Sequence, residues 1–405
     1  MVTLSSVAEI LNGDRSANYP SGNDFVAFGF PFINAGHLKN GKIDFSNMDY
    51  ISEDKYRQLS GAKIRKNDIL LCLRGSLGKY AVSNIDDGAP ASSIAVIRPN
   101  ERVINCKFLT CVISSFIFQK QIDLANNGSS QPNLSASSVS DFLIPIPPLD
   151  EQKRIAEALS DVDDMISSLE KLVVKKKAIK QGAMQELLTG KKRLPGLVGA
   201  WQSFAFGELF DFIPNNSFTR AQMTDNGIVK NIHYGDILTK FGAWINGESE
   251  LIPYISEEID LSRFADRCYL KSGDIIIADT AEDETVGKAI EVVNVNGPIL
   301  AGQHTLLCRP KLKFADKFLG YYLNAACYHD QLLQYVVGTK VSSISKASIA
   351  QTMLVVPGYE EQQTIAEILS NMDAEIEVLE QKLEKMRQVK QGMMQQLLTG
   401  KIRLA

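Results

Sequence analysis

One long segment of the chain occurs twice. Residues 151–194 and 361–404 align without a gap at a separation of 210 residues, and 24 of the 44 aligned positions are identical. Both copies begin with Glu-Gln-x-x-Ile-Ala-Glu and end near Leu-Leu-Thr-Gly-Lys. Solenoid proteins repeat at periods of about 20–50 residues, so two copies this far apart are not a solenoid. The repeat instead indicates a chain built from two similar halves.

Each copy has the pattern of a long coiled-coil helix. Apolar residues recur at alternating steps of four and three, which places them in one narrow seam. Proline or glycine precedes each copy, and Gly190 or Gly400 stands near its end, where helices often stop. About 38 residues at 1.5 Å per residue predict a rod about 57 Å long. The predicted seam comprises Ile155, Leu159, Val162, Ile166, Leu169 and Val173 in the first copy, and Ile365, Leu369, Met372, Ile376, Leu379 and Leu383 in the second.

Lysines interrupt this seam, at Lys176 and Lys180 in the first copy and at Lys390 in the second. An apolar seam must be buried against something, and the nearest partner is the other copy in the same chain. Antiparallel pairing would return the C-terminus to the start of the chain and make a nearly circular molecule with pseudo-two-fold symmetry. The alternative is that each helix pairs with another protein.

Outside the two repeat segments, the sequence predicts two mixed globular domains, so the expected fold class is α+β with two long helices. Short β-rich runs alternate with loops rich in glycine, asparagine and serine. Amphipathic stretches at 107–122 and 316–336 predict helices that pack on the sheet. The expected β-rich runs are 68–73, 92–98, 274–278 and 305–308. The expected segments are a domain at 1–150, a helix at 151–194, a domain at 195–360 and a helix at 361–405.

Composition and missing motifs exclude several classes of protein. No apolar run is long enough to cross a membrane, and the six scattered cysteines suggest reduced, intracellular thiols rather than a zinc site. The formal charge of −4 argues against a general polyanion binder but allows a local nucleic-acid surface. No phosphate-binding loop is present, and the nearest match to an Asn/Asp-Pro-Pro-aromatic motif, Ile146–Leu149, lacks the key residues. We therefore expect catalytic chemistry to come from partner proteins.

The order of variable domain, Glu-Gln-x-x-Ile-Ala-Glu helix ending in Leu-Leu-Thr-Gly-Lys, variable domain and the same helix again resembles the specificity subunit of type I restriction–modification systems. The resemblance covers the whole chain. It implies a non-catalytic subunit with two target recognition domains, each reading one half of an asymmetric, bipartite site in double-stranded DNA.

The resemblance also implies the partners. The helices would act as a ruler and as the docking surface for two modification subunits, which are adenine-N6 methyltransferases. Restriction subunits would complete an ATP-driven endonuclease. S-adenosylmethionine, ATP and Mg are expected on these partner subunits, with no cofactor or metal in this chain and no membrane contact.

The loop at 74–79 follows a predicted strand and combines two cations, a hydroxyl group and two glycines, a mixture that suits close approach to phosphates. An ordinary solvated hairpin loop is the alternative. The matching loop at 279–284 is acidic, and its carboxylates could accept from cytosine, cap turns or hold a metal. Candidate DNA contacts are Arg74, Ser76, Lys79, Gln131 and Asn133 in the first half, and Lys230, His233, Tyr234, His304, Lys340 and Ser342 in the second.

These candidates have structural alternatives. Amides suit adenine and lysine suits guanine or phosphate, but turn and capping hydrogen bonds use the same groups. The histidines could equally be structural, and Tyr234 and Trp244 could pack in the core. The basic run at 175–177 is either a solvated helix face or a docking surface. At the level of function, the rivals are a two-headed protein scaffold and a stand-alone nuclease or methylase.

Overall fold

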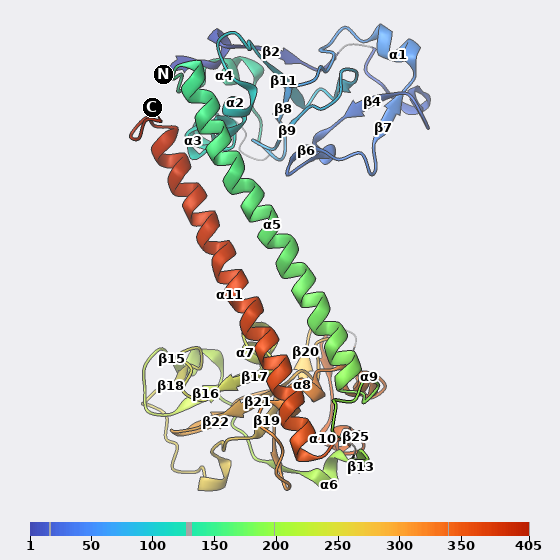
Figure 1. Ribbon diagram of the computed structural model, residues 1–405, viewed down its shortest axis with the longest axis vertical. Coiled ribbons are helices and arrows are strands. Elements are labelled where there is room, and N and C mark those ends of the chain that lie inside the picture. Colours follow the sequence, from blue (N-terminus) through green and yellow to red (C-terminus); the bar gives the residue numbers. More distant parts are fainter. Residues whose placement is uncertain (16–17, 127–131, 198, 339, 405) are drawn as a thin grey trace. The chain divides into compact units, whose positions relative to one another are not determined.

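The structure is a computed structural model that describes residues 1–15, 18–126, 132–197, 199–338 and 340–404 (Figure 1). The chain divides into two compact units. The first unit contains Met1–Glu170 and Lys382–Ala405, and the second contains Lys171–Gln381. Each unit therefore combines one globular part with segments of both long helices, and the C-terminal helical segment belongs to the same unit as the N-terminus.

A six-stranded sheet forms the centre of the first unit, with strand order β2–β11–β8–β9–β6–β5. A four-stranded sheet, β10–β4–β7–β3, and the pair β1–β12 complete it. Every residue of β8 is buried, because this strand lies inside the sheet with β11 and β9 on either side. The strands are β1 (Val2–Thr3), β2 (Ala8–Asn12), β3 (Phe25–Val26), β4 (Phe30–Ile33), β5 (Leu38–Lys39), β6 (Gly41–Ile43), β7 (Asp49–Ile51), β8 (Ile69–Cys72), β9 (Tyr80–Val82), β10 (Ala89–Pro90), β11 (Ile94–Pro99) and β12 (Leu143–Ile144).

Helices cover one face of the six-stranded sheet in the first unit. Phe108 and Phe118 are fully buried in a core that also contains Ile155 and Leu159 of one long helix and Leu397 of the other. Both long helices are thus part of the hydrophobic core of this unit. The shorter helices are α1 (Glu53–Gln58), α2 (Cys106–Ile113), α3 (Phe116–Ala125) and α4 (Ala136–Ser140).

The second unit has the same plan, with a five-stranded sheet in the order β14–β23–β19–β21–β17 and a four-stranded sheet in the order β15–β18–β16–β22. Two further pairs are β13–β25 and β20–β24. The strands are β13 (Gln202–Ala205), β14 (Phe210–Ile213), β15 (Met223–Thr224), β16 (Lys230–Ile232), β17 (Trp244–Asn246), β18 (Tyr254–Ile255), β19 (Asp274–Ala278), β20 (Thr280–Ala281), β21 (Ala289–Val293), β22 (Ile299–Ala301), β23 (Thr305–Pro310), β24 (Ser342–Ser343) and β25 (Met353–Val356).

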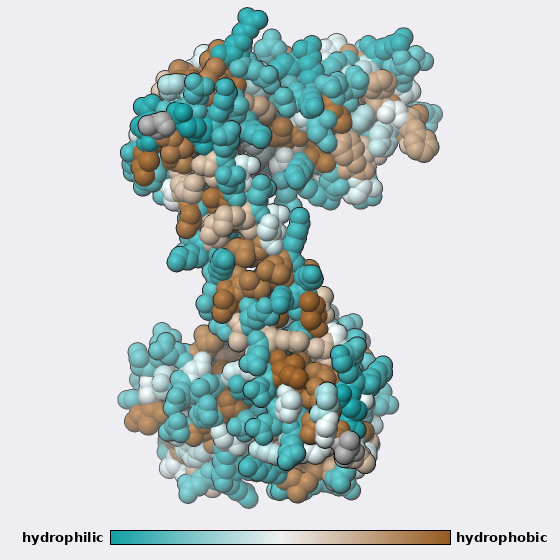
Figure 2. Space-filling model, in the orientation of Figure 1, coloured by the Kyte–Doolittle hydropathy of each residue, from teal (hydrophilic) through white to brown (hydrophobic). Residues whose placement is uncertain are grey.

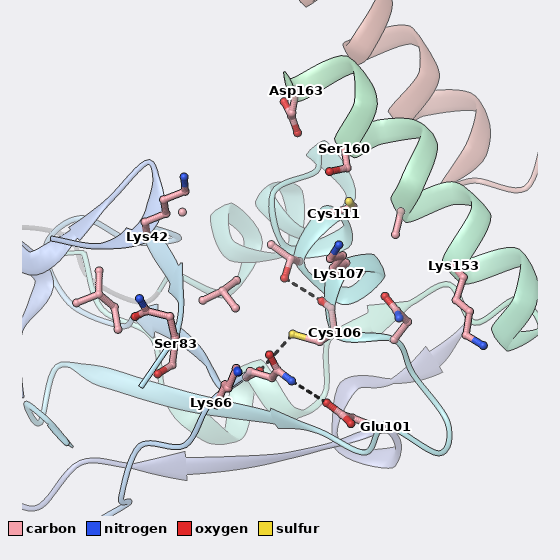
Figure 3. A pocket seen from close by; sticks show the side chains of 18 of the residues that line it. Lys42, Lys66, Ser83, Glu101, Cys106, Lys107, Cys111, Lys153, Ser160 and Asp163 are labelled. Atoms are coloured by element: carbon pink, nitrogen blue, oxygen red, sulfur yellow. Dashed lines mark hydrogen bonds between the residues drawn. The ribbon is translucent and has the colours of Figure 1, made fainter. Parts of the chain in front are cut away.

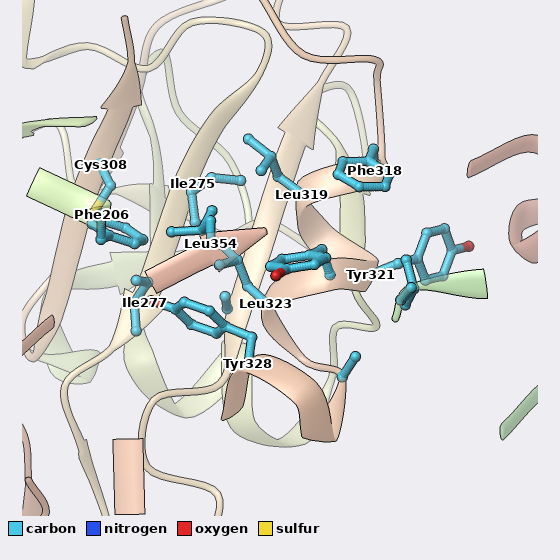
Figure 4. Packing of buried hydrophobic residues seen from close by; sticks show 14 of the residues in the cluster. Phe206, Ile275, Ile277, Cys308, Phe318, Leu319, Tyr321, Leu323, Tyr328 and Leu354 are labelled. Atoms are coloured by element: carbon cyan, nitrogen blue, oxygen red, sulfur yellow. The ribbon is translucent and has the colours of Figure 1, made fainter. Parts of the chain in front are cut away.

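Large aromatic residues fill the main core of the second unit. Phe206, Phe318, Tyr321 and Tyr328 are almost fully buried in one cluster, which also contains Ile275 and Ile277 of β19 (Figure 4). The Tyr328 hydroxyl group satisfies its polarity by a 2.8 Å hydrogen bond with the hydroxyl group of Thr352. The shorter helices are α6 (Phe206–Leu209), α7 (Tyr234–Thr239), α8 (Phe318–Leu323), α9 (Ala326–Leu333) and α10 (Lys346–Ala350).

The same ion pair with a buried aspartate occurs inside each unit. In the first unit, Arg98 donates to both carboxylate oxygens of Asp68 at 2.9 and 2.8 Å. In the second unit, Arg309 donates in the same way to Asp274 at 2.9 and 2.6 Å. The repetition of this contact supports the interpretation of two similar halves.

The two long helices are α5 (Leu149–Leu187) and α11 (Tyr359–Leu397), each 39 residues long. Each starts next to the expected proline or glycine, and Gly190 and Gly400 follow their ends with φ of 68° and 71°. Only glycine takes up this left-handed conformation without strain, so these residues end the helices.

Within each unit, α5 and α11 pack antiparallel (Figure 1). In the first unit, Glu170 pairs with Arg387 and Asp163 pairs with Lys390, so residue numbers rise along one helix as they fall along the other. The second unit contains the matching pairs, Lys177 with Glu380 and Lys180 with Asp373. The expected fold of two mixed domains with two long, mutually packed helices is confirmed.

Most predicted seam residues are buried in these helix pairs. Ile166, Met372 and Leu379 are half-buried. The buried ones are Ile155, Leu159, Val162 and Leu169 of α5 and Leu383 of α11 in the first unit, and Val173 of α5 and Ile365, Leu369 and Ile376 of α11 in the second. The lysines that interrupt the seam, Lys176, Lys180 and Lys390, form ion pairs with acids on the facing helix.

Both amphipathic stretches are helical, as expected, and each contains one break. The stretch 107–122 forms two helices, α2 and α3, and the stretch 316–336 forms α8 and α9. At the first break, the Ser115 hydroxyl group bonds to the carbonyl oxygen of Val112 and competes with helix continuation. At the second break, the Asn324 amide group donates to the carbonyl oxygens of Gly320 and Ala289. None of the described helices is long and apolar enough to span a membrane.

Candidate nucleic-acid interface

In the first unit, the loop that joins β8 to β9 carries an exposed arginine. Arg74 lies opposite Asn133 in an isolated bridge between two segments, and the Gly75 N–H donates to the carbonyl oxygen of Pro132 at 3.2 Å. Gly75 has a φ of 76°, which lets the loop turn sharply. Within the described residues, the Arg74 guanidinium makes no hydrogen bond or ion pair. Its five donors are therefore available to a ligand.

Lys79, at the end of the same loop, has a local role. Its Nζ donates to the carbonyl oxygen of Ala35 at 2.8 Å and ties the loop to the η3 turn (Ala35–His37). Ser76 is exposed at the tip of the loop. A DNA contact by either residue stays a prediction, and Lys79 would have to exchange or share its present partner. Gln131 lies outside the described residues.

The second unit repeats this arrangement at β20 and β24. Thr280 pairs with Ser343 in the short ladder, as Arg74 pairs with Asn133 in the first unit. The Ile344 N–H donates to the Asp279 carbonyl oxygen at 2.9 Å. The same bond links Leu134 to Leu73 at 2.9 Å in the first unit. We call these matching regions the first and second loop clusters, the first comprising Leu73–Lys79, Ser92, Ser93 and Pro132–Leu134, and the second Asp279–Ala281, Gln303, His304 and Ser342–Ile344.

Three rings lie beside the second loop cluster. The rings of Tyr234 and His304 are nearly perpendicular, with their centres 5.3 Å apart, and the centres of the His233 and Tyr234 rings are 4.6 Å apart. The exposed His304 has a φ of 55°, an uncommon conformation for a residue other than glycine. Its ring nitrogen Nδ1 is 3.4 Å from the Thr280 hydroxyl group and 3.7 Å from Asp279. Tyr234 and His304, predicted separately from the sequence, are thus brought together.

Other predicted contacts on the second unit already serve the fold. Lys230 donates from Nζ to the carbonyl oxygens of Gly247 and Ser249 at 3.1 and 3.0 Å. His233 caps α7 by accepting from the Gly235 N–H, which requires a neutral ring nitrogen. Burial lowers the pKa of His233 and favours that neutral form. DNA contacts by these two residues stay predictions.

From the sequence, Gln131 and Asn133 are expected to match Lys340 and Ser342, and the strand register corrects this match. Asn133 corresponds to Ser343 at a separation of 210, and it is Ser343 that lies opposite Thr280. Ser342, the residue we expected, is the neighbour that pairs with Ala281. Lys340 is exposed. Ser93 takes the place of His304 in the first loop cluster but is not among the residues predicted from the sequence. The two residues are 211 positions apart, close to the repeat separation of 210, and this spacing could have identified Ser93.

The first unit also contains a cavity of about 1030 Å³ (Figure 3). It lies at the end of the β8–β9 pair that is away from the first loop cluster. Four lysines line it, namely Lys42, Lys66, Lys107 and Lys153. Burial raises the pKa of the Cys106 and Cys111 thiols in its wall to about 11, so both remain protonated and poorly nucleophilic near neutral pH. Among the described residues, no group of three His, Cys, Asp or Glu side chains is placed to hold a metal ion.

A family model described as the type I restriction modification DNA specificity domain matches residues 1–181 and 199–388. The chain belongs to this family. It is a DNA specificity subunit and not one of the catalytic subunits of a type I system.

Individual relatives agree with this assignment over nearly the whole specificity subunit. The type I restriction enzyme MjaVIII specificity subunit of Methanocaldococcus jannaschii is 24% identical over 93% of this chain and 86% of its own length. The S subunit structure from M. genitalium has a TM-score of 0.56 at 15% identity, covering 98% of this chain and 95% of that one. A structure described as the basis of complex assembly and conformational transition of the type I R-M system has a TM-score of 0.62 at 19% identity. The match covers 98% of this chain and 96% of that one. The structural likenesses support the fold.

Proposed function

We propose that this specificity subunit reads an asymmetric, bipartite site in double-stranded DNA, with one half-site read by each unit. The observation that supports this most directly is the pair of loop clusters. Their backbones make the same hydrogen bonds in both units, yet their exposed side chains differ. A repeated frame with different side chains is expected of two readers of different sequences, because base edges are distinguished by side-chain donors and acceptors.

The proposed DNA contacts of the first unit are Arg74, Ser76, Lys79, Gln131 and Asn133. Those of the second unit are Lys230, His233, Tyr234, His304, Lys340 and Ser342. The exposed cations and hydroxyl groups suit phosphates, and the amides and histidines suit base edges.

The two long helices provide the proposed docking surface for two modification subunits. Besides the seam, each helix pair exposes apolar side chains to solvent (Figure 2). Large exposed apolar groups on a soluble protein commonly mark protein interfaces. In the first unit these are Met165 and Val389, and in the second Leu172, Val174, Ile179 and Val378. One structural relative belongs to a type I R-M system whose complex assembly has been described, which is consistent with such docking.

Catalysis is assigned to the partners. The modification subunits would bind S-adenosylmethionine, and restriction subunits would bind ATP and Mg. With a formal charge of −4, the isolated chain should bind DNA weakly, because phosphate neutralisation supplies much of the affinity for DNA. Nanomolar, salt-resistant binding by the chain alone would contradict this division of roles.

Exchange of one globular part tests the proposed function. Residues 1–150 are replaced by the equivalent segment of a relative, and the complex with its modification subunits is allowed to methylate genomic DNA. Long-read sequencing of methylated adenines should show one half-site changed and the other retained. Under the rival hypothesis of a protein scaffold that never contacts bases, the methylated sequence stays the same.

A further inference from the structure

Corresponding positions of the two loop clusters carry different side chains, and these differences indicate which bases each unit reads. Resting on the proposed function, we infer that the Asp279 carboxylate accepts a hydrogen bond from the exocyclic amino group of a cytosine in the major groove. In the other half-site, the Arg74 guanidinium donates to the O6 and N7 acceptors of a guanine. Both are pairings in which the side chain and base edge have complementary hydrogen-bonding groups.

The Asp279 carboxylate is held in place through one of its two oxygens, and the other oxygen can accept a hydrogen bond from a ligand. Its Oδ1 accepts from the Thr280 hydroxyl group at 2.9 Å and lies 3.7 Å from Nδ1 of His304. Within the described part of the chain, Oδ2 has no hydrogen-bond partner. The side chain is 25% exposed, so it is oriented by neighbours while one acceptor oxygen remains available to a ligand.

The backbone around Asp279 is fixed from two sides. Its N–H donates to the carbonyl oxygen of His304 at 3.2 Å, and its carbonyl oxygen accepts from Ile344 at 2.9 Å. The Tyr234 ring packs against the His304 ring in a T-shaped arrangement. A carboxylate on such a frame has a restricted position, which is what discrimination between base edges requires.

The corresponding position in the first unit carries no carboxylate. Leu73 stands where Asp279 stands, and its N–H and carbonyl oxygen make the same two bonds, to Ser93 at 2.7 Å and to Leu134 at 2.9 Å. The fold of this loop therefore does not need the Asp279 carboxylate. The next residue in the first unit is Arg74, which stands where Thr280 stands in the second. The group available to a ligand is therefore a carboxylate acceptor, Asp279, in the second unit and a guanidinium donor, Arg74, in the first.

Two other charged residues offer controls that remove charges of the same sign. Glu282 lies in the same acidic loop three residues from Asp279 and is exposed. Within the described residues, no hydrogen bond or ion pair involves the Glu282 side chain. Arg102 is likewise exposed in the first unit, and its guanidinium has no described partner. Glu282→Gln and Arg102→Ala therefore remove the same charges without altering the loop clusters.

The experiment uses the full chain assembled with its modification subunits. Methylated adenines are mapped by long-read sequencing for the wild type, Asp279→Asn, Asp279→Ala, Arg74→Ala and the two controls. Binding of each assembled complex is also measured against duplexes that carry every base at every position of the site. This binding measurement reports base preference even where methylation becomes slow.

Asp279→Ala should reduce discrimination at one cytosine of one half-site by about tenfold or more. Asp279→Asn replaces an acceptor by an N–H donor, so preference at that position should move from cytosine to a base that presents an acceptor. Arg74→Ala should relax one guanine in the other half-site. Both controls should keep the wild-type preferences.

Unchanged preferences in the Asp279 variants, relaxation in both half-sites, or complete loss of binding by the isosteric Asp279→Asn would each overturn the inference. Failure of the proposed function itself gives a different result, because exchange of residues 1–150 would then leave both half-sites of the methylated sequence unchanged.

Discussion

Arg403 and Glu151 form a two-pronged ion pair inside the first unit, in which Nε and Nη2 of the arginine donate to the two carboxylate oxygens at 2.7 and 2.5 Å. Arg193 and Glu361 make the same contact in the second unit, at 2.8 Å for both bonds. In each unit, the arginine ends one copy of the repeat and the glutamate begins the other copy. The end of each copy therefore contacts the beginning of the other copy, and this contact holds the C-terminal segment in the first unit.

The Arg403–Glu151 pair predicts a pH-dependent contribution to stability. Hydrogen bonding by Arg403 lowers the pKa of Glu151 below its usual range. Because the folded-state pKa lies below the unfolded value of about 4.3, this stabilisation is complete above about pH 4.3 and is lost as pH falls through the folded-state pKa. Urea denaturation should show Arg403→Gln less stable than the wild type at pH 7, with the difference shrinking below about pH 4. The exposed Lys401→Gln serves as control, and an equal difference at both pH values would argue against the ion pair as its cause.

An isolated first half should form a homodimer. The contacts between the two copies are self-complementary, so α5 of one molecule can pair antiparallel with α5 of another. A chain of residues 1–195 carries every charge needed for the three repeated ion pairs, which would be Arg193 with Glu151, Lys180 with Asp163 and Lys177 with Glu170. Light scattering of this fragment should give the mass of a dimer at micromolar concentration.

Reversal of the Lys177 and Lys180 charges provides the matched control for that fragment. Lys177→Glu with Lys180→Glu places like charges opposite Glu170 and Asp163 and should weaken the dimer. A wild-type fragment that stays monomeric would show that the helix contacts need both copies in one chain.

The long helices could be predicted from sequence because their structure depends on a local, repeated pattern. The steps of four and three located the seam, and proline and glycine located the ends within a few residues. Even the interruptions of the seam by Lys180 and Lys390 are explained by acids at matching positions of the facing helix. Pattern and fold agree here because the partner of each helix is a copy of the same sequence.

The loop clusters were less predictable because their side chains meet through non-local contacts. Nothing near Lys230 in the sequence shows that its ammonium group is held by two carbonyl oxygens from another loop. The proximity of Tyr234 and His304 depends on the pairing of β16 with β22, two strands far apart in sequence. The position of Ser343, and not Ser342, opposite Thr280 follows from a strand register that only the structure contains.

The arginines that pair with the two buried aspartates should stabilise the two units independently. Asp68 and Asp274 are 1% exposed, and each accepts a bidentate contact from one arginine. Loss of the arginine leaves a buried carboxylate without its cation, which costs about 3–5 kcal/mol. Hydrogen exchange should show β8 and β11 destabilised by Arg98→Ala, and β19 and β23 destabilised by Arg309→Ala. Spread of either effect to the sheet of the other unit would contradict independent folding.

The ruler role predicts that the gap between half-sites grows with helix length. One heptad inserted after Glu170 in α5 and another after Gln381 in α11 keep both helix pairs in register, because these positions lie at the boundaries between the units. Seven residues preserve the phase of the seam and add about 10 Å, or about three base pairs at 3.4 Å each. Mapping of methylated adenines should therefore show a gap about three base pairs longer between unchanged half-sites. Insertion into α5 alone shifts its ion pairs out of register and should abolish methylation, whereas an unchanged gap in the doubly extended chain would rule out the ruler.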